Sequence, residues 1–385
     1  MKPLTATLGH AFLWLLASVA CASPLYAATY VYVSNAADGT ISTYRLDEAT
    51  GKLSPGETVP SGKQVMPMAV SPDHRYLYAA VRSVPYNVQT FTIDPHTGNL
   101  HKLSQSPVGY SFAYISLDKT GKYLFGSSYD DDLFTVHSIH KGVLSDKALQ
   151  TLRTRQNAHS VRIDNSNRYL FVANLGGERV YQYRFDARTG KVTPNEPPYL
   201  DAPAGLGPRH PAFSPDGRFV YILDELQDKI ITYALDPDSG RLTQVAVTSA
   251  LPAGTRLVPG APRGAVRNHT PAMQPHADTS HDIWSADIHI TPDGSYLYTS
   301  ERTSSVLSEL KVDKASGALT LVGTFPTEEQ PRGFAITADG KYLICTGEKS
   351  ETLSVFSIDP ATGKLRLAGK YPDGHDANWV ETVTL

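Results

Sequence analysis

The sequence has little of three features that mark common classes of protein. Two cysteines, Cys21 and Cys345, stand among 385 residues, too few for a disulfide framework. Lys and Arg number 35 against 38 Asp and Glu, and no long basic run gives the electrostatic footprint of a nucleic-acid-binding protein. The apolar run at residues 11–22 is shorter than the roughly 20 residues of a membrane-spanning helix. We therefore expect no nucleic-acid partner and no membrane insertion.

What the N-terminus does contain is an export signal. Lys2 precedes the apolar run, and small residues follow it up to Ala27 and Ala28. This order is typical of a secretory signal peptide, so we predict a signal at residues 1–28 with cleavage near Ala27 or Ala28, and a periplasmic or secreted mature protein. The alternative is a lipoprotein cleaved before Cys21, which follows the segment Leu-Ala-Ser-Val-Ala.

The remainder of the chain is a repeat. An aromatic-aliphatic-aromatic triplet, or a close variant, occurs seven times, each time followed by a second β-like segment and a turn that ends in Gly. The triplets lie at residues 30–32, 76–78, 123–125, 169–171, 219–221, 296–298 and 342–344. Successive turn glycines are 47, 44, 48, 50, 77 and 46 residues apart. Such spacing is typical of four-stranded propeller blades, so we predict an all-β, seven-bladed propeller over residues 29–385.

The two ends of this repeat complement each other. The chain enters at Thr29 with what would be the second strand of a blade, and residues 377–385 resemble a first strand with nothing after it. We predict that the C-terminal strand completes the N-terminal blade, because closure removes the sheet edges that an open stack would expose. We expect a monomer.

Two positions of the repeat are predicted to face the channel mouth. Counted from the first residue of the inner hairpin turn, positions −6 and +10 lie near each other at the same end of the hairpin. Position −6 holds Met66, Ala113, His159, Arg209, Ala286 and Arg332. Position +10 holds Arg82, Tyr129, Leu175, Glu225, Arg302 and Glu348. Seven of these twelve residues are His, Arg or Glu, which a purely structural propeller does not require.

This charged ring has two interpretations. A histidine and a carboxylate among guanidinium groups, as with His159 and Glu225, form a plausible acid/base pair beside an anion clamp. Alternatively, Arg209 with Glu225, and Arg332 with Glu348, are cross-strand ion pairs that only hold their hairpins.

The single long interval of the repeat, residues 251–282, emerges on the same face as the ring. It contains five Pro, three Gly, His269, His276 and His281, and we predict that it acts as a lid over the channel mouth. The histidine spacings of seven and five fit no familiar metal-ligand pattern, so we expect no metal. Motifs of serine hydrolases, nucleotide-binding proteins and zinc proteases are absent.

Several phrases of the sequence are specific enough to indicate a family. They are Asn157-Ala158-His159-Ser160, Gly207-Pro208-Arg209-His210, Asp224-Glu225-Leu226, Trp284-Ser285-Ala286-Asp287-Ile288-His289, Glu301-Arg302-Thr303 and Gln330-Pro331-Arg332-Gly333-Phe334. With them the chain resembles the seven-bladed β-propeller lactonases, which include bacterial propeller-type 6-phosphogluconolactonases and fungal carboxy-muconate lactonizing enzymes. The resemblance implies that His159, Arg209, Glu225 and Arg302 are catalytic. We expect Arg332, His210, Arg82 and Glu348 to contact the substrate.

The resemblance implies a carboxylic-ester hydrolase that opens a sugar-type lactone, like a 6-phosphogluconolactonase, with no metal and no cofactor. Arg209 and Arg302 would stabilise the oxyanion, while Glu225 and His159 would act as base and acid in an order that the sequence leaves open. An export signal is unexpected for a sugar phosphate made in the cytoplasm. The alternatives are an exported, non-enzymatic propeller that acts as a binding scaffold and a muconate-type lactonizing cycloisomerase. The irregular charged ring favours an enzyme.

Overall fold

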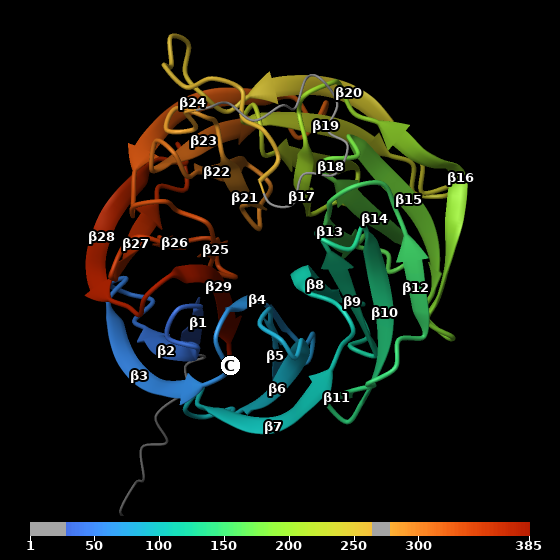
Figure 1. The fold of residues 1–385 in the computed structure, drawn as a ribbon. Coiled ribbons are helices and arrows are strands. Elements are labelled where there is room, and N and C mark those ends of the chain that lie inside the picture. Colours follow the sequence, from blue (N-terminus) through green and yellow to red (C-terminus); the bar gives the residue numbers. More distant parts are fainter. Residues whose placement is uncertain (1–27, 264–277) are drawn as a thin grey trace, which may run out of the picture.

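The predicted seven-bladed propeller is confirmed. The computed structural model describes residues 28–263 and 278–385, which form seven antiparallel sheets set around a central axis (Figure 1). The predicted signal peptide falls on residues 1–27 and so lies outside the described residues, apart from Ala28. Among the described residues, no helix has the length and apolar character needed to cross a membrane.

Six blades have four strands and one has five. The first blade joins both ends of the chain and consists of β29 (Ala377–Thr384), β1 (Thr29–Asn35), β2 (Thr40–Leu46) and β3 (Leu53–Pro60). The second holds β4 (Val65–Val70), β5 (Tyr76–Val81), β6 (Asn87–Ile93) and β7 (Leu100–Pro107). The third holds β8 (Phe112–Leu117), β9 (Tyr123–Ser128), β10 (Leu133–His140), β11 (Val143–Leu144) and β12 (Gln150–Arg153).

The other four blades follow in chain order. The fourth holds β13 (Ala158–Ile163), β14 (Tyr169–Asn174), β15 (Arg179–Asp186) and β16 (Lys191–Asp201). The fifth holds β17 (Pro208–Phe213), β18 (Phe219–Asp224), β19 (Lys229–Leu235) and β20 (Leu242–Ser249). The sixth holds β21 (Ser285–Ile290), β22 (Tyr296–Glu301), β23 (Val306–Val312) and β24 (Leu319–Pro326). The seventh holds β25 (Phe334–Ile336), β26 (Tyr342–Thr346), β27 (Thr352–Ile358) and β28 (Leu365–Pro372).

The repeated triplet forms the second strand of every blade, counted from the axis, and packs between blades. In β1, Tyr32 donates its hydroxyl to the carbonyl oxygen of Gly98 at 2.8 Å, in the turn before the outer strand of the next blade. Gly98 has a φ of +68°, and a Cβ at this position would overlap the ring of Tyr30. Glycine therefore serves both the left-handed turn and the close approach of the neighbouring aromatic ring.

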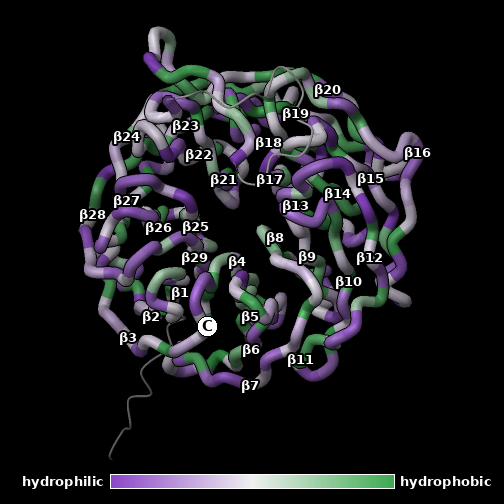
Figure 2. The backbone as a smooth tube through the Cα atoms, in the orientation of Figure 1, coloured by the Kyte–Doolittle hydropathy of each residue, from purple (hydrophilic) through white to green (hydrophobic). Residues whose placement is uncertain are grey.

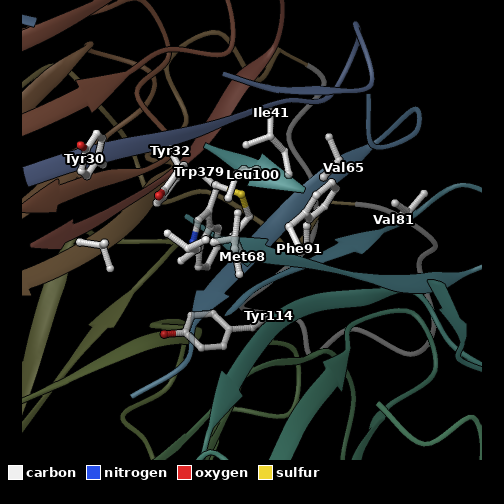
Figure 3. Packing of buried hydrophobic residues seen from close by; sticks show 14 residues of the cluster. Tyr30, Tyr32, Ile41, Val65, Met68, Val81, Phe91, Leu100, Tyr114 and Trp379 are labelled. Atoms are coloured by element: carbon white, nitrogen blue, oxygen red, sulfur yellow. The ribbon is translucent and has the colours of Figure 1, made fainter. Parts of the chain in front are cut away.

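Ring closure follows the prediction. Strand β29 pairs antiparallel with β1, with Val33 opposite Val380 and Thr29 opposite Thr384. Trp379 of β29 belongs to one buried cluster with Tyr32 and Met68, so the C-terminal strand packs against the first and second blades (Figure 3). Hydrophobic and hydrophilic segments both occur along the blades (Figure 2), and exposed residues concentrate in outermost strands such as β3 and β28, whereas β1 and β18 are buried throughout.

Deletion of residues 377–385 tests how far the fold depends on this closure. The deletion removes the buried side chains of Trp379, Val380 and Val383 and exposes the edge of β1. At roughly 1.5–3 kcal/mol for each large apolar side chain, the loss is comparable with the roughly 5–15 kcal/mol that stabilises a typical domain. We expect a lower melting temperature and concentration-dependent aggregation by light scattering. Deletion of Leu385 alone is the control, and a truncated protein as stable and monomeric as the full chain would contradict the role of closure.

Candidate active site at the channel mouth

The innermost strands share an irregularity that turns position −6 away from the sheet. In β13, Ala158 pairs with Asn174 and Ser160 with Ala173, which leaves His159 as the bulged residue between them. Arg209 occupies the corresponding place in β17, between Pro208 and His210. A bulge leaves one residue without a ladder partner and changes the direction of its side chain. Position −6 can therefore contribute side chains to the channel.

Ten of the twelve ring positions meet in one cavity of about 320 Å³. Leu175 and Ala286 are the two that do not line it. The lining residues are Met66, Arg82, Ala113, Tyr129, Asp130, His159, Arg209, Glu225, Arg263, Trp284, Arg302, Arg332 and Glu348. All four residues expected to be catalytic, and three of the four expected to contact substrate, therefore come together.

Glu225 lies at the centre of the polar contacts in this cavity. Its Oε2 accepts a hydrogen bond of 2.6 Å from Arg209 Nε and lies 3.2 Å from Arg302 Nη2. Its Oε1 accepts a hydrogen bond of 3.0 Å from Trp284 Nε1. Arg209 belongs to the same blade as Glu225, whereas Arg302 and Trp284 flank the inner hairpin of the sixth blade. An ion pair that only holds one hairpin therefore explains the contact with Arg209 but not the contacts with Arg302 and Trp284.

The positive surroundings keep Glu225 ionised. Burial alone would raise the pKa of this carboxyl, but the guanidinium groups of Arg302 and Arg209 outweigh burial, and the pKa lies below its ordinary value of 4.5. Glu225 is 4% exposed. A buried carboxylate with all these partners is well oriented and carries its charge at neutral pH.

His159 lies beside this carboxylate as a neutral imidazole. Its Nε2 is 3.8 Å from Glu225 Oε2, and its ring contacts those of Tyr129 and His210 edge to face. Burial first, and then the positive charge of Arg209, hold the pKa of His159 well below its ordinary value of 6.5. The buried Nδ1 has no hydrogen-bond partner within the described chain. At neutral pH this ring can accept a proton.

Two arginines are anchored so that one nitrogen of each is unused. Arg209 Nη1 donates to the carbonyl oxygen of Ala286, while Arg302 donates through Nε to Trp284 O at 2.9 Å and through Nη2 to Ser285 O at 3.0 Å. Arg209 Nη2 and Arg302 Nη1 make no hydrogen bond to the described residues. These two nitrogens are available to a negatively charged oxygen in the cavity.

The remaining charged residues of the ring form a second group. Arg332 Nε lies 3.4 Å from Glu348 Oε1, which is the predicted cross-strand pair, yet the buried Arg332 Nη1 has no partner among the described residues. Arg82 donates to Ser111 Oγ at 3.1 Å and lies 4.0 Å from Asp130 Oδ2. The two arginines and two carboxylates of this group balance in formal charge, while Arg332 Nη1 remains a donor for a ligand.

His210 is the predicted substrate contact that the structure corrects. It does not line the cavity, because its ring is buried behind Arg209 with Nδ1 2.9 Å from Asp287 Oδ1. Burial, then Arg209, lowers the pKa of His210 to about 3 despite Asp287. Since Arg209 Nη1 lies 3.2 Å from His210 Nε2, His210 supports the arginine from behind.

Besides Met66 and Ala113, four lining residues were not among the predicted site residues. Tyr129 stands in the ring but carries no charge at neutral pH, and Asp130 is its chain neighbour. Trp284 opens the Trp-Ser-Ala-Asp-Ile-His phrase, which could have indicated it. Arg263 lies in the long segment and had no local signal. With it, five arginines face the carboxylates of Asp130, Glu225 and Glu348, so the cations exceed the anions by two.

The predicted lid is described only at its two ends. Residues 264–277, with His269 and His276, lie outside the described residues. At the ends, Gly260 N donates to Leu226 O, and Val258 forms an isolated bridge with Asp282. Within residues 28–263 and 278–385, no three His, Cys, Asp or Glu side chains are arranged as a metal site. The N-terminal end of this segment, residues 251–263, brings Arg263 to the cavity.

Comparison with known proteins identifies relatives over most of the chain. Residues 24–382 match the family model described as lactonase, 7-bladed beta-propeller. Proteins named 6-phosphogluconolactonase from Pectobacterium carotovorum and Serratia proteamaculans are 35% and 34% identical, each over 80% of this chain and 84% of the relative.

Solved structures show the same fold. A periplasmic gluconolactonase from Pseudomonas aeruginosa superposes with a TM-score of 0.79 at 25% identity, over 92% of this chain and 99% of that one. A propeller from Bacteroides fragilis gives a TM-score of 0.80 at 24% identity, over 94% and 99% of the two chains. By its blades, its sequence and its family model, the chain belongs to the seven-bladed β-propeller lactonase family.

Proposed function

We propose that the protein hydrolyses the ester bond of a sugar lactone, without a metal or another cofactor, at the cavity around Glu225. The observation that carries this proposal is the contact of one ionised carboxylate with two guanidinium groups, beside a neutral histidine. Lactone opening needs a proton acceptor for water and a stabiliser for the oxyanion, and this set contains both. The names of the relatives, 6-phosphogluconolactonase and gluconolactonase, support a sugar lactone as substrate.

In this mechanism the lactone carbonyl oxygen points toward Arg209 Nη2 and Arg302 Nη1. Water gives a proton to His159 while its oxygen attacks the carbonyl carbon, and the charge that develops on the carbonyl oxygen is stabilised by the two guanidinium groups. The tetrahedral intermediate then collapses, the bond to the ring oxygen breaks, and the imidazolium of His159 protonates that oxygen. The product is an open-chain hydroxy acid, and His159 is neutral again.

We assign the role of general base to His159 and not to Glu225, because the two side chains differ in whether an atom is free to accept a proton. Both oxygens of Glu225 are engaged, Oε2 with the arginines and Oε1 with Trp284. His159 Nε2 makes no hydrogen bond to the described residues, and the ring is neutral. Glu225, at 3.8 Å, would stabilise the imidazolium as it forms and hold the two arginines in place.

Export is part of the proposal. The apolar run and small residues of the N-terminus support cleavage near Ala27 or Ala28, and the periplasmic gluconolactonase neighbour supports a periplasmic site of action. A lactone outside the cytoplasm would then be the substrate, and the N-terminus of the mature protein, read by mass spectrometry, tests this cleavage. We further propose that the protein acts as a monomer, with residues 251–282 at the channel mouth.

A lactone panel tests the proposed activity. Purified mature protein is titrated at constant pH with phosphorylated and unphosphorylated sugar lactones and with a carboxylated muconolactone, and acid release is compared with spontaneous hydrolysis. We expect catalysed opening of at least one sugar lactone. Activity on the muconolactone alone would favour the cycloisomerase alternative, and no catalysis with retained binding would favour a binding scaffold.

Glu225→Gln preserves the shape of the side chain and removes its charge. We expect kcat/KM for the best lactone to fall about 100-fold or more, since the stabiliser of the imidazolium is lost and both arginines are released. The melting temperature should also fall, because two buried guanidinium groups lose their counter-charge.

The matched control is Glu328→Gln. Glu328 is also buried and bonded, with Lys370 Nζ at 3.1 Å and hydroxyl donors from Ser354 and Thr352, but it does not line the cavity. This variant should lose stability and keep its activity. Equal activity loss in both variants, or a wild-type rate in Glu225→Gln, would mean that Glu225 has only a structural role.

The pH profile tests His159 as the base. A group whose pKa is depressed stays neutral below pH 6.5, so kcat/KM should persist there and decline only at lower pH. The substrate should be a lactone without phosphate, because the phosphate itself titrates near pH 6. Circular dichroism at each pH controls for unfolding. An acid limb centred at or above pH 6.5 would argue against this neutral histidine.

A further inference from the structure

Arg263 differs from the other arginines of the cavity because its charge has no counter-ion among residues 28–263 and 278–385. Arg209 and Arg302 share Glu225, Arg332 lies beside Glu348, and Arg82 approaches Asp130. Arg263 makes no hydrogen bond or ion pair with the described residues, and its recorded contact is with the ring of Trp284, 3.6 Å from its guanidinium carbon to the centroid. The hydrogen-bond donors of its guanidinium group are therefore available to a ligand.

Trp284 separates this free charge from the proposed reacting centre. The guanidinium carbon of Arg302 lies 3.7 Å from the centroid of the same ring, and two groups this close must occupy opposite faces. The two guanidinium carbons are therefore about 7 Å apart across the indole. A straight line between them passes through the indole, so a sugar lactone that contacts both groups must extend past the edge of the ring. Arg263 is thus too remote to serve the carbonyl that Arg302 faces and suitably placed for the other end of such a molecule.

A second cavity of about 320 Å³ continues beyond this wall. It shares Arg263, Trp284 and Arg302 with the first cavity, and hydroxyl and amide groups dominate the rest of its lining. Its other lining residues are Thr279, Ser280, Thr303, Ser305, Glu329, Gln330 and Lys349. Glu329 is the single carboxylate there, against Arg263, Arg302 and Lys349, so this extension is also positively charged. A polar, cation-rich extension suits the charged end of a substrate.

We propose that Arg263 is a specificity residue that binds an anionic substituent of the lactone, a phosphate ester or a carboxylate, where the two cavities meet. This inference rests on the proposed lactonase function and adds the charge that the substrate carries. A guanidinium group stacked on an aromatic ring keeps its planar fork of donors free, and that fork matches two oxygens of a phosphate or carboxylate. The substrate would supply the counter-ion that the protein does not.

The test compares three lactones with one ring scaffold: 6-phosphoglucono-lactone, glucono-lactone, and a sugar lactone with a carboxylate in place of the phosphate. In Arg263→Gln, we expect KM for the phosphorylated lactone to rise about 10-fold or more while kcat changes less than about threefold. The reason is that the substitution removes one charge-assisted contact that is equally strong in the bound substrate and in the transition state. KM for the neutral lactone should rise much less than KM for the phosphorylated one. Arg263→Lys should recover part of the loss, because it restores charge without the fork.

Arg256→Gln is the matched control. Arg256 is an exposed arginine of the same segment that lines neither cavity, so its loss removes one positive charge from the segment without affecting recognition. A similar KM change in both variants would assign the effect to overall charge. An equal change on charged and neutral lactones in Arg263→Gln would assign Arg263 to packing against Trp284. Either result overturns the proposal.

Calorimetry separates failure of this proposal from failure of the proposed function. The wild-type protein should bind 6-phosphogluconate at least about 10-fold more tightly than gluconate, and Arg263→Gln should abolish that preference. Retained preference in the variant overturns the role of Arg263 even if lactones are hydrolysed, and so does a wild-type protein that prefers neither 6-phosphogluconate nor the ring-opened carboxylated lactone over gluconate. The preference together with no hydrolysis would retain the anion site and refute the lactonase activity. If the carboxylated lactone alone responds to Arg263→Gln, the substituent is a carboxylate.

Discussion

The packing of each blade against the next through an aromatic ring on a turn glycine is the contact on which the rest of the molecule depends. Tyr30 on Gly98 is one instance, and Tyr342 on Gly51 is the instance that joins the last blade to the first. Because these contacts and the β1–β29 pairing close a ring, no blade can shift without opening another junction. The inner strands are thereby held around the axis, and the channel mouth is a rigid place on which to mount side chains.

The site uses this rigidity to hold charges that would be costly elsewhere. Arg209, Glu225 and Arg302 are almost fully buried, and the desolvation of such charges is repaid only by well-aligned partners. Glu225 receives these partners from two blades, so it links the fifth and sixth blades as well as orienting both arginines. In the proposed mechanism this one carboxylate has a structural and a catalytic role, which is why a matched buried carboxylate is needed to separate them.

The balance of charge divides the cavity into parts with different tasks. Glu225 neutralises much of the positive charge around His159, where the proton must move. Arg263, which forms no ion pair within the described residues, leaves positive charge away from that centre, and Arg332 Nη1 offers an unpartnered donor. One end of the cavity is thus suited to chemistry and the other to recognition of an anion, with Trp284 between them.

The sequence by itself determined the number of blades, the closure by residues 377–385 and the set of side chains at the mouth, since period-two alternation and repeat spacing are local properties of the chain. Only the tertiary structure decided how that set is connected. The bulges that project His159 and Arg209, the burial of His210 behind Arg209, and the sharing of Glu225 between blades all depend on contacts between residues distant in sequence. Arg263 illustrates the limit best, because a long loop has no periodicity from which the position of one side chain can be read.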